Sequence, residues 1–160
     1  MPFKFTEENL EKIKQEFKKY PLKKPVVMKA LYIAQEQNGY ISNEVIVEVA
    51  KLLEITPEEV LGVVTFYTMF HQKPMGKFHI QVCTNVSCML RGGYELWDQV
   101  KEKFGIDNME VTGDGKFSLE EVECMGSCGT APMIAVNEDY FENLTKEKVE
   151  EILESLKNTN

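Results

Sequence analysis

Apolar residues in the first half of the chain recur every three or four positions, which is the spacing of amphipathic helices. This spacing predicts four short helices within residues 1–75. The first helix has the apolar residues Leu10, Ile13, Phe17 and Tyr20, and the second runs over residues 25–38 and stops at Gly39. The third begins after Ser42 with the apolar residues Val45, Ile46, Val49, Leu52 and Leu53, and the fourth has Val60, Val63, Val64, Tyr67 and Phe70. Thr56, Pro57 and Glu59 form a helix-start signal with a threonine N-cap and a capping box. Four such helices favour a bundle.

From residue 76 onward the pattern changes. Phe78, Ile80 and Val82 alternate with polar residues, which predicts a strand, and helical spacing follows over 94–104. Short strands are predicted at 117–119 and 133–136, with a turn at 137–139. Thr145 then caps a last helix whose apolar residues are Val149, Ile152, Leu153 and Leu156. The fold class is therefore predicted to be α+β, with a small helical bundle over 1–75 and an α/β domain over 76–160.

The distribution of charge supports the same boundary. Residues 1–75 carry ten lysines and ten glutamates, whereas residues 76–160 carry eight basic and sixteen acidic side chains, so the second part holds the whole net charge of −8. Turn-forming residues at 72–76 lie where the balance changes. We expect a solvated acidic surface there, with an interface for a basic partner as the alternative. The acidic balance argues against a nucleic acid as partner.

The hydrophobic pattern predicts neither a membrane-spanning segment nor a signal peptide. The sequence has no run of 18 apolar residues, and residues 1–6 lack the apolar stretch of a signal peptide. We therefore expect a cytoplasmic location. In that compartment, paired cysteines are more often metal ligands than structural disulfides.

The chain contains four cysteines in two close pairs, Cys83-x4-Cys88 and Cys124-x3-Cys128. Four thiolates that arrive as two pairs can complete a tetrahedral zinc site or hold a two-iron cluster with two sulfurs on each iron. The second spacing alone suits zinc, whereas the first loop is slightly wide for a zinc knuckle. The choice therefore lies between an iron–sulfur cluster, a zinc site and disulfides, and the sequence lacks the Cys-x2-Cys pair of thiol–disulfide enzymes.

The residues around the pairs favour the cluster. The first pair lies between the predicted strand and the following helix, where a turn directs backbone N–H groups toward negatively charged sulfur. The second pair is followed by small residues, which let the backbone approach a cluster closely. Hydrogen bonds from such backbone to sulfur tune the reduction potential.

These blocks carry a family resemblance. Cys83-Thr-Asn-Val-Ser-Cys88-Met-Leu-Arg-Gly-Gly93 and Glu121-Val-Glu-Cys124-Met-Gly-Ser-Cys128-Gly-Thr-Ala-Pro-Met133 resemble the thioredoxin-like [2Fe–2S] ferredoxins. Within that family they are most similar to the members that serve as the E subunit of NADH-quinone oxidoreductase, respiratory complex I. The resemblance covers nearly the whole chain, because segments 39–42 and 63–70 match the small helical domain of these proteins.

The resemblance implies both a fold and a role. The fold over 76–160 would be thioredoxin-like, and Cys83, Cys88, Cys124 and Cys128 would hold one [2Fe–2S] cluster. The chain would be the iron–sulfur subunit of an oxidoreductase in the peripheral arm of the complex. It would exchange single electrons with the FMN of the NADH- and FMN-binding flavoprotein, the F subunit of the complex, and would not oxidise NADH alone. One alternative is the equivalent subunit of an NAD-linked hydrogenase or formate dehydrogenase. The other is an interaction module that is stabilised by zinc.

The remaining histidine, aromatic, glycine and proline candidates are expected to have structural roles. His79 could approach a cluster, but with four thiolates available we expect a solvated surface histidine, and His71 has no partner pattern. Phe66, Tyr67 and Phe70 are expected in the core because of their helical spacing. The segment 113–115 is expected to be a turn, since it does not open a nucleotide-binding helix. The bond before Pro132 is expected to be trans, although thioredoxin-like folds commonly have a cis bond there.

Overall fold

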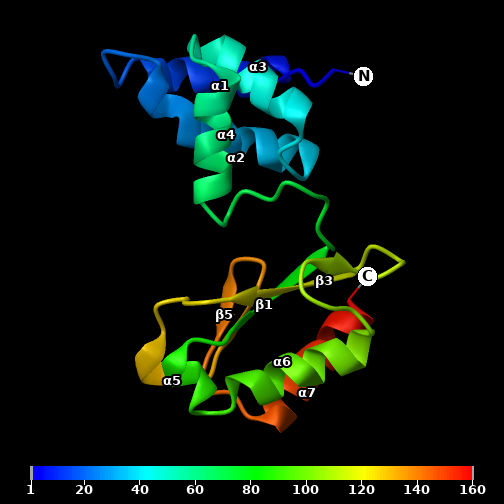
Figure 1. Cartoon of the computed structure of the whole chain (residues 1–160). Helices are drawn as coiled ribbons and strands as arrows, with labels where there is room; N and C mark the ends of the chain where they lie inside the picture. Colours follow the sequence, from blue (N-terminus) through cyan, green and yellow to red (C-terminus); the bar gives the residue numbers. More distant parts are fainter. Residues whose placement is uncertain (1, 160) are drawn as a thin grey trace. The chain divides into compact units, whose positions relative to one another are not determined.

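The computed structural model describes residues 2–159, and the chain divides into two compact units, Met1–Pro74 and Met75–Asn160 (Figure 1). The first unit is helical and the second combines a sheet with helices. Each unit has its own apolar core, so the change of pattern near residue 75 coincides with a change from one core to another.

The first unit consists of helices only, among the residues described. Its elements are α1 (Glu7–Phe17), the 3-10 helix η1 (Lys24–Val26), α2 (Val27–Asn38), α3 (Asn43–Leu53) and α4 (Pro57–Phe66). Residues from each predicted apolar stripe pack against one another in a core that includes Ile13, Leu31, Val45, Leu53 and Val60. Tyr20 was predicted on the first stripe, but it lies beyond the end of α1 and is 45% exposed. The four predicted helices are thus confirmed.

The helix ends follow the local sequence signals. Thr56 and Glu59 form the predicted capping box at the start of α4, and Ser42 accepts a hydrogen bond from the Val45 N–H at the start of α3. Gly39 ends α2 in the left-handed conformation, with φ of 84°. Only a residue without a side chain adopts this conformation at little cost.

Helix α4 ends earlier than predicted, and this changes the environment of its aromatic residues. The backbone is extended at Tyr67, so Phe70 reaches the core from the following segment. Phe66 is 76% exposed and Tyr67 is 39% exposed, so the prediction that these two residues lie in the core was wrong, whereas Phe70 is buried as predicted. The reason for Phe66 is its place on the helix. Phe66 lies about 240° around the helix axis from the buried Val60, so it projects away from the buried stripe.

The second unit is built on a five-stranded sheet in the order β2-β3-β1-β4-β5. The strands are β1 (Phe78–Cys83), β2 (Glu110–Val111), β3 (Phe117–Val122), β4 (Ile134–Val136) and β5 (Asp139–Phe141). The helices are α5 (Val86–Met89), α6 (Gly93–Phe104), the 3-10 helix η2 (Cys128–Thr130) and α7 (Lys146–Asn158). The sequence did not predict β2 or β5, which have only two and three residues and therefore no measurable alternation.

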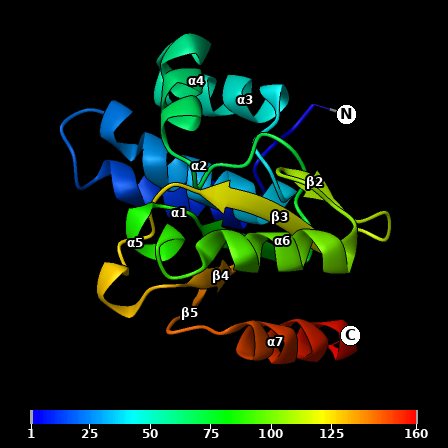
Figure 2. The ribbon, with the colours of Figure 1, turned by 60° about the horizontal axis from the view of Figure 1, so that its bottom comes forward.

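Strand β1 lies in the middle of the sheet. It is parallel to β3 and antiparallel to β4, and α6 lies in the connection between β1 and β3. Figure 2 shows α6 beside β3. One face of the sheet packs against α6 and α7 through a core that includes Ile80, Leu119, Trp97 and Leu153. This arrangement agrees with the predicted α+β class.

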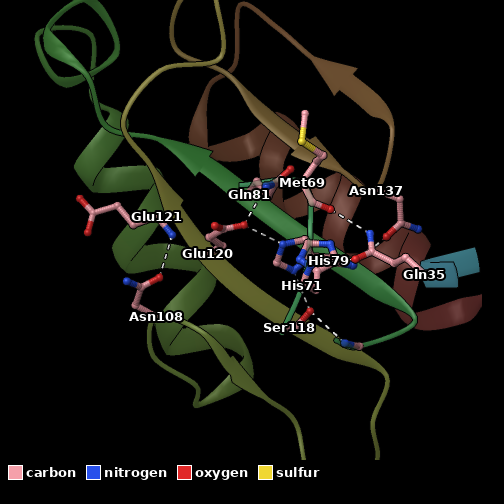
Figure 3. Close-up of polar contacts among 11 residues, drawn as sticks. Gln35, Met69, His71, His79, Gln81, Asn108, Ser118, Glu120, Glu121 and Asn137 are labelled. Atoms are coloured by element: carbon pink, nitrogen blue, oxygen red, sulfur yellow. Dashed lines mark hydrogen bonds and ion pairs between the residues drawn. The ribbon is translucent and has the colours of Figure 1, made fainter. Parts of the chain in front are cut away.

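The other face of β1 and β3 carries a polar chain centred on His79, shown in Figure 3. Its Nδ1 lies 2.8 Å from Ser118 Oγ and its Nε2 lies 2.9 Å from Glu120 Oε2, while Gln81 also donates to Glu120. His79 is only 5% exposed, so the prediction of a solvated histidine was wrong. The parallel register places His79 opposite Ser118, and the sequence contains no signal for that pairing.

The bond between Ala131 and Pro132 is cis, which corrects the expectation of a trans bond. An X–Pro bond adopts the cis form at small cost, and both residues are buried just before β4. The segment 113–115 is the predicted turn between β2 and β3, with a positive φ at Gly115.

Candidate metal centre

The sheet brings the two cysteine pairs to one edge. Cys83 is the last residue of β1, and the parallel register places it opposite Val122, the last residue of β3. The chain after β3 therefore leaves the sheet beside the chain after β1. The first of these segments contains Cys124 and Cys128, and the second contains Cys88.

The first cysteine loop contains a short helical turn, α5, within the strand-to-helix turn that the sequence predicts. Asn85 begins it by accepting a hydrogen bond from the Val86 N–H, and Cys88 lies on its buried side. Cys83 is 4% exposed and Cys88 is 3% exposed. Both thiols are therefore shielded from water.

Helix α6 begins directly against this loop. A Cβ at Gly93 would lie 2.9 Å from the carbonyl oxygen of Cys83 and 3.0 Å from that of Cys88. Carbon atoms do not approach backbone oxygen so closely without displacing it. Glycine at position 93 thus lets the first turn of α6 contact both cysteine carbonyls.

The second cysteine loop is more open. Cys124 and Cys128 are exposed, and the loop contains a left-handed Gly126 with φ of 76° before Cys128 begins η2. After η2 the chain becomes buried again at Ala131. Exposure on this side and burial on the other give the candidate site one accessible face.

The two loops meet through both apolar and polar contacts. Cys83, Cys88, Ala131 and Met133 form one small buried cluster, with Met125 packed against it. The guanidinium of Arg91, just after the first loop, donates a hydrogen bond to the carbonyl oxygen of Ala131, just after the second. No pattern in the sequence indicated this role for Arg91.

The pKa of the Cys88 thiol reflects its burial and the cysteines near it. This pKa is raised from 9.0 to about 11, mainly by burial and further by the neighbouring Cys83 and the charge of Cys128. A hydrogen bond from the backbone of Met133 acts in the opposite direction. A thiolate at Cys88 is therefore unfavourable in the protein alone and would be stabilised by a bound cation.

The four predicted cysteine ligands differ in their exposure to solvent. Cys83 and Cys88 are buried together, whereas Cys124 and Cys128 are both exposed, and Cys128 is the one of these two whose charge contributes to the raised pKa of Cys88. Within residues 2–159, no three histidine, cysteine or acidic side chains converge as a ready-made metal site. The donor set nevertheless fits an iron–sulfur group, since it offers thiols, a buried inner wall and a backbone N–H directed at sulfur.

Residues 13–157 match the family model of the thioredoxin-like [2Fe–2S] ferredoxins. This chain belongs to that family. The E subunit of NADH-quinone oxidoreductase from Rickettsia bellii is 46% identical, over 98% of this chain and 95% of its own length. NADH-quinone oxidoreductase subunit 2 of Thermus thermophilus is 42% identical, over 96% of this chain and 86% of its own length. The resemblance inferred from the cysteine blocks is confirmed.

Among solved structures, a chain of an NAD+-reducing [NiFe]-hydrogenase in the H2-reduced state superposes with a TM-score of 0.73 over 85% of this chain. The sequences are 19% identical, so the likeness concerns the fold. The matched region is 23% of the hydrogenase chain. None of the helices between residues 2 and 159 is long and apolar enough to cross a lipid bilayer.

Proposed function

We propose that this chain carries one [2Fe–2S] cluster on Cys83, Cys88, Cys124 and Cys128 and transfers single electrons within an NADH:quinone oxidoreductase. The observation that supports this most strongly is the convergence of the two cysteine loops. The parallel pairing of β1 with β3 carries both loops to one edge of the sheet, where the buried Cys83 and Cys88 pack against Ala131 and Met133, which follow the second cysteine pair. Membership of the [2Fe–2S] family favours iron over zinc.

When bound, the cluster supplies one-electron redox chemistry, and the protein supplies its environment. Cys83 and Cys88 form the dry side of the site, and the Met133 backbone donates a hydrogen bond to the Cys88 sulfur. Such a hydrogen bond stabilises negative charge on the sulfur and raises the reduction potential. The exposed loop of Cys124 and Cys128 forms the side from which an electron partner has access.

The surface beside the first loop suits a protein partner. Four apolar side chains on α5 and the start of α6 are exposed, namely Val86, Met89, Leu90 and Tyr94. Leu90 is 77% exposed, and Figure 1 shows α5 at the periphery of the second unit. Exposed apolar patches of this kind mark interaction sites.

We assign this surface to the NADH- and FMN-binding flavoprotein of the complex. NADH gives up two electrons together as a hydride, whereas a [2Fe–2S] group accepts one at a time, so a flavin must divide the pair. The relatives named above are subunits of an NADH-quinone oxidoreductase, which implies an assembly of several chains. The chain would then act in the peripheral arm of that assembly, on the cytoplasmic side.

Three measurements test this proposal. Chemical analysis should find about two irons and two acid-labile sulfides per chain, and the dithionite-reduced protein should give an electron paramagnetic resonance signal of a reduced [2Fe–2S] group. NADH should leave the visible absorption unchanged until the flavoprotein is added. Colourless protein containing zinc would overturn the iron assignment, and rapid bleaching by NADH alone would overturn the need for a flavoprotein.

A further inference from the structure

Glu142 connects the end of the β4–β5 hairpin to the second cysteine loop. It immediately follows β5, and its carboxylate accepts hydrogen bonds from the hydroxyls of Ser127 and Thr130. The Thr130 bond measures 2.6 Å. These contacts join residues that are 15 and 12 positions apart in the sequence.

The two hydroxyls lie on either side of Cys128, one residue before it and two residues after it. They are also 2.8 Å from each other, so Ser127, Thr130 and Glu142 form one network around the base of η2. The backbone strengthens the connection, since the Asn143 N–H donates to the Thr130 carbonyl oxygen at 2.7 Å. Cys128 is therefore held between two residues that are both tied to the hairpin.

The loop needs such a tie because its own sequence provides little rigidity. Gly126 and Gly129 flank Ser127 and Cys128, and glycine loses more conformational freedom on ordering than other residues. Hydrogen bonds to an ionised carboxylate are about twice as strong as bonds between neutral groups. A single carboxylate that accepts two of them can thus select one loop conformation among many.

We propose that Glu142 is a positioning residue that fixes the Cys128 loop in the conformation needed for ligation. The inference rests on the proposed function, because it treats Cys128 as a ligand. Glu142 also places a negative charge beside the site. Since reduction adds negative charge to an iron–sulfur group, this carboxylate disfavours the reduced state and lowers the reduction potential.

Two variants separate the geometric effect from the charge effect. E142A removes both the hydrogen bonds and the charge, whereas E142Q keeps an oxygen acceptor and removes only the charge. E138A is the matched control, because Glu138 is exposed in the turn between β4 and β5 and takes no part in the network around Cys128. All three changes affect the same hairpin and remove one negative charge.

The first measurement uses the full chain with its cluster. Loss of iron to a chelator should be roughly ten-fold faster in E142A than in the wild type, and E142Q should largely restore the wild-type rate. The midpoint potential should rise in both E142A and E142Q and stay near the wild-type value in E138A. Iron loss and midpoint potential in E142A equal to those of E138A would overturn the proposal.

The second measurement uses the full chain without iron and does not depend on the proposed function. Amide hydrogen exchange in segment 124–131 should be faster in E142A than in the wild type and in E138A. Equal exchange in all three would show that Glu142 does not hold the loop. A wild-type chain that binds no iron would refute the proposed function, while the exchange data would still decide whether Glu142 positions Cys128.

Discussion

Arg91 Nη1 lies 3.2 Å from the carbonyl oxygen of Ala131, so the residue three positions after Cys88 is hydrogen-bonded to the residue three positions after Cys128. Arg91 is the only arginine in the chain. Its guanidinium donates across the boundary between the two cysteine loops. The two pairs of cysteines are therefore linked by a direct polar contact as well as by the sheet.

Replacing Arg91 should loosen this link. Arg91→Ala should lower the free energy of unfolding of the iron-free protein by about 1 kcal/mol, because the lost hydrogen bond is charged but only partly buried. It should also speed the release of iron. The free energy of unfolding of Arg91→Lys should fall between those of the alanine variant and the wild type, since a lysine ammonium can donate a hydrogen bond but lacks the planar guanidinium group. Lys51→Ala, which removes an exposed positive charge from α3 in the first unit, is the control. An effect there as large as that of Arg91→Ala would contradict the assignment.

Removing any of the four cysteines should abolish or badly destabilise the cluster. A missing thiolate leaves iron open to solvent. Iron content and visible absorption after purification measure the effect for Cys83→Ala, Cys88→Ala, Cys124→Ala and Cys128→Ala. Ser87→Ala, inside the first loop, is a control that should keep its iron. Cys124 and Cys128 are the most informative positions because both are exposed, and a full-intensity spectrum in Cys124→Ala would remove Cys124 from the ligand set.

A side chain at position 93 should be costly. Gly93→Ala places a methyl group within 3.0 Å of the carbonyl groups of Cys83 and Cys88, so the start of α6 must move. We expect a loss of about 1–3 kcal/mol in urea unfolding of the iron-free protein, as for other overpacked sites. Gly113→Ala has open space around it and should change stability by less than about 0.5 kcal/mol. Equal stabilities would show that α6 adjusts freely.

The raised pKa of Cys88 should appear as low reactivity in the iron-free protein. Because its pKa is about 11 instead of 9.0, its thiolate fraction at pH 8 is about a hundredfold lower than that of an unperturbed cysteine. Mass spectrometry should find the exposed Cys124 alkylated by iodoacetamide well before Cys88. Comparable rates at pH 8 would contradict the burial of Cys88.

The raised pKa of Cys88 also predicts how the stability of the iron-free protein changes with pH. The folded pKa lies above the unfolded one, so the folded iron-free protein binds this proton more tightly between pH 9 and pH 11. The contribution of Cys88 is therefore complete below pH 9 and is lost as the pH rises toward 11. Cys88→Ala should lose less stability over that range than the wild type, and Cys124→Ala should behave as the wild type does.

The second unit should hold the cluster by itself. Residues 75–160 contain all four cysteines, a complete sheet core and the contact between Gly76 and Ser118. Expressed alone, this segment should be coloured and contain iron and sulfide in equal amounts. If colour requires residues 1–74 as well, the two units form one folding unit with respect to the site.

Features that depend on neighbours along the chain could be predicted from the sequence. Helical spacing located the four helices of the first unit, the Thr56 capping box and Gly39 marked helix ends, and alternation identified β1. The spacing and flanks of Cys83, Cys88, Cys124 and Cys128 were enough to reveal the family. Each of these signals is read within a segment of the chain, where propensity, periodicity and residue spacing act.

Which distant segments meet depends on tertiary packing and became clear only from the structure. The parallel register of β1 and β3 buries His79 against Ser118, and it carries the second cysteine loop to the first. The early end of α4 exposes Phe66, and the hairpin after β4 brings Glu142 to Ser127 and Thr130. The polar contacts around the cysteine loops join residues 12 to 40 positions apart. They follow from packing and strand pairing, which local sequence patterns do not encode.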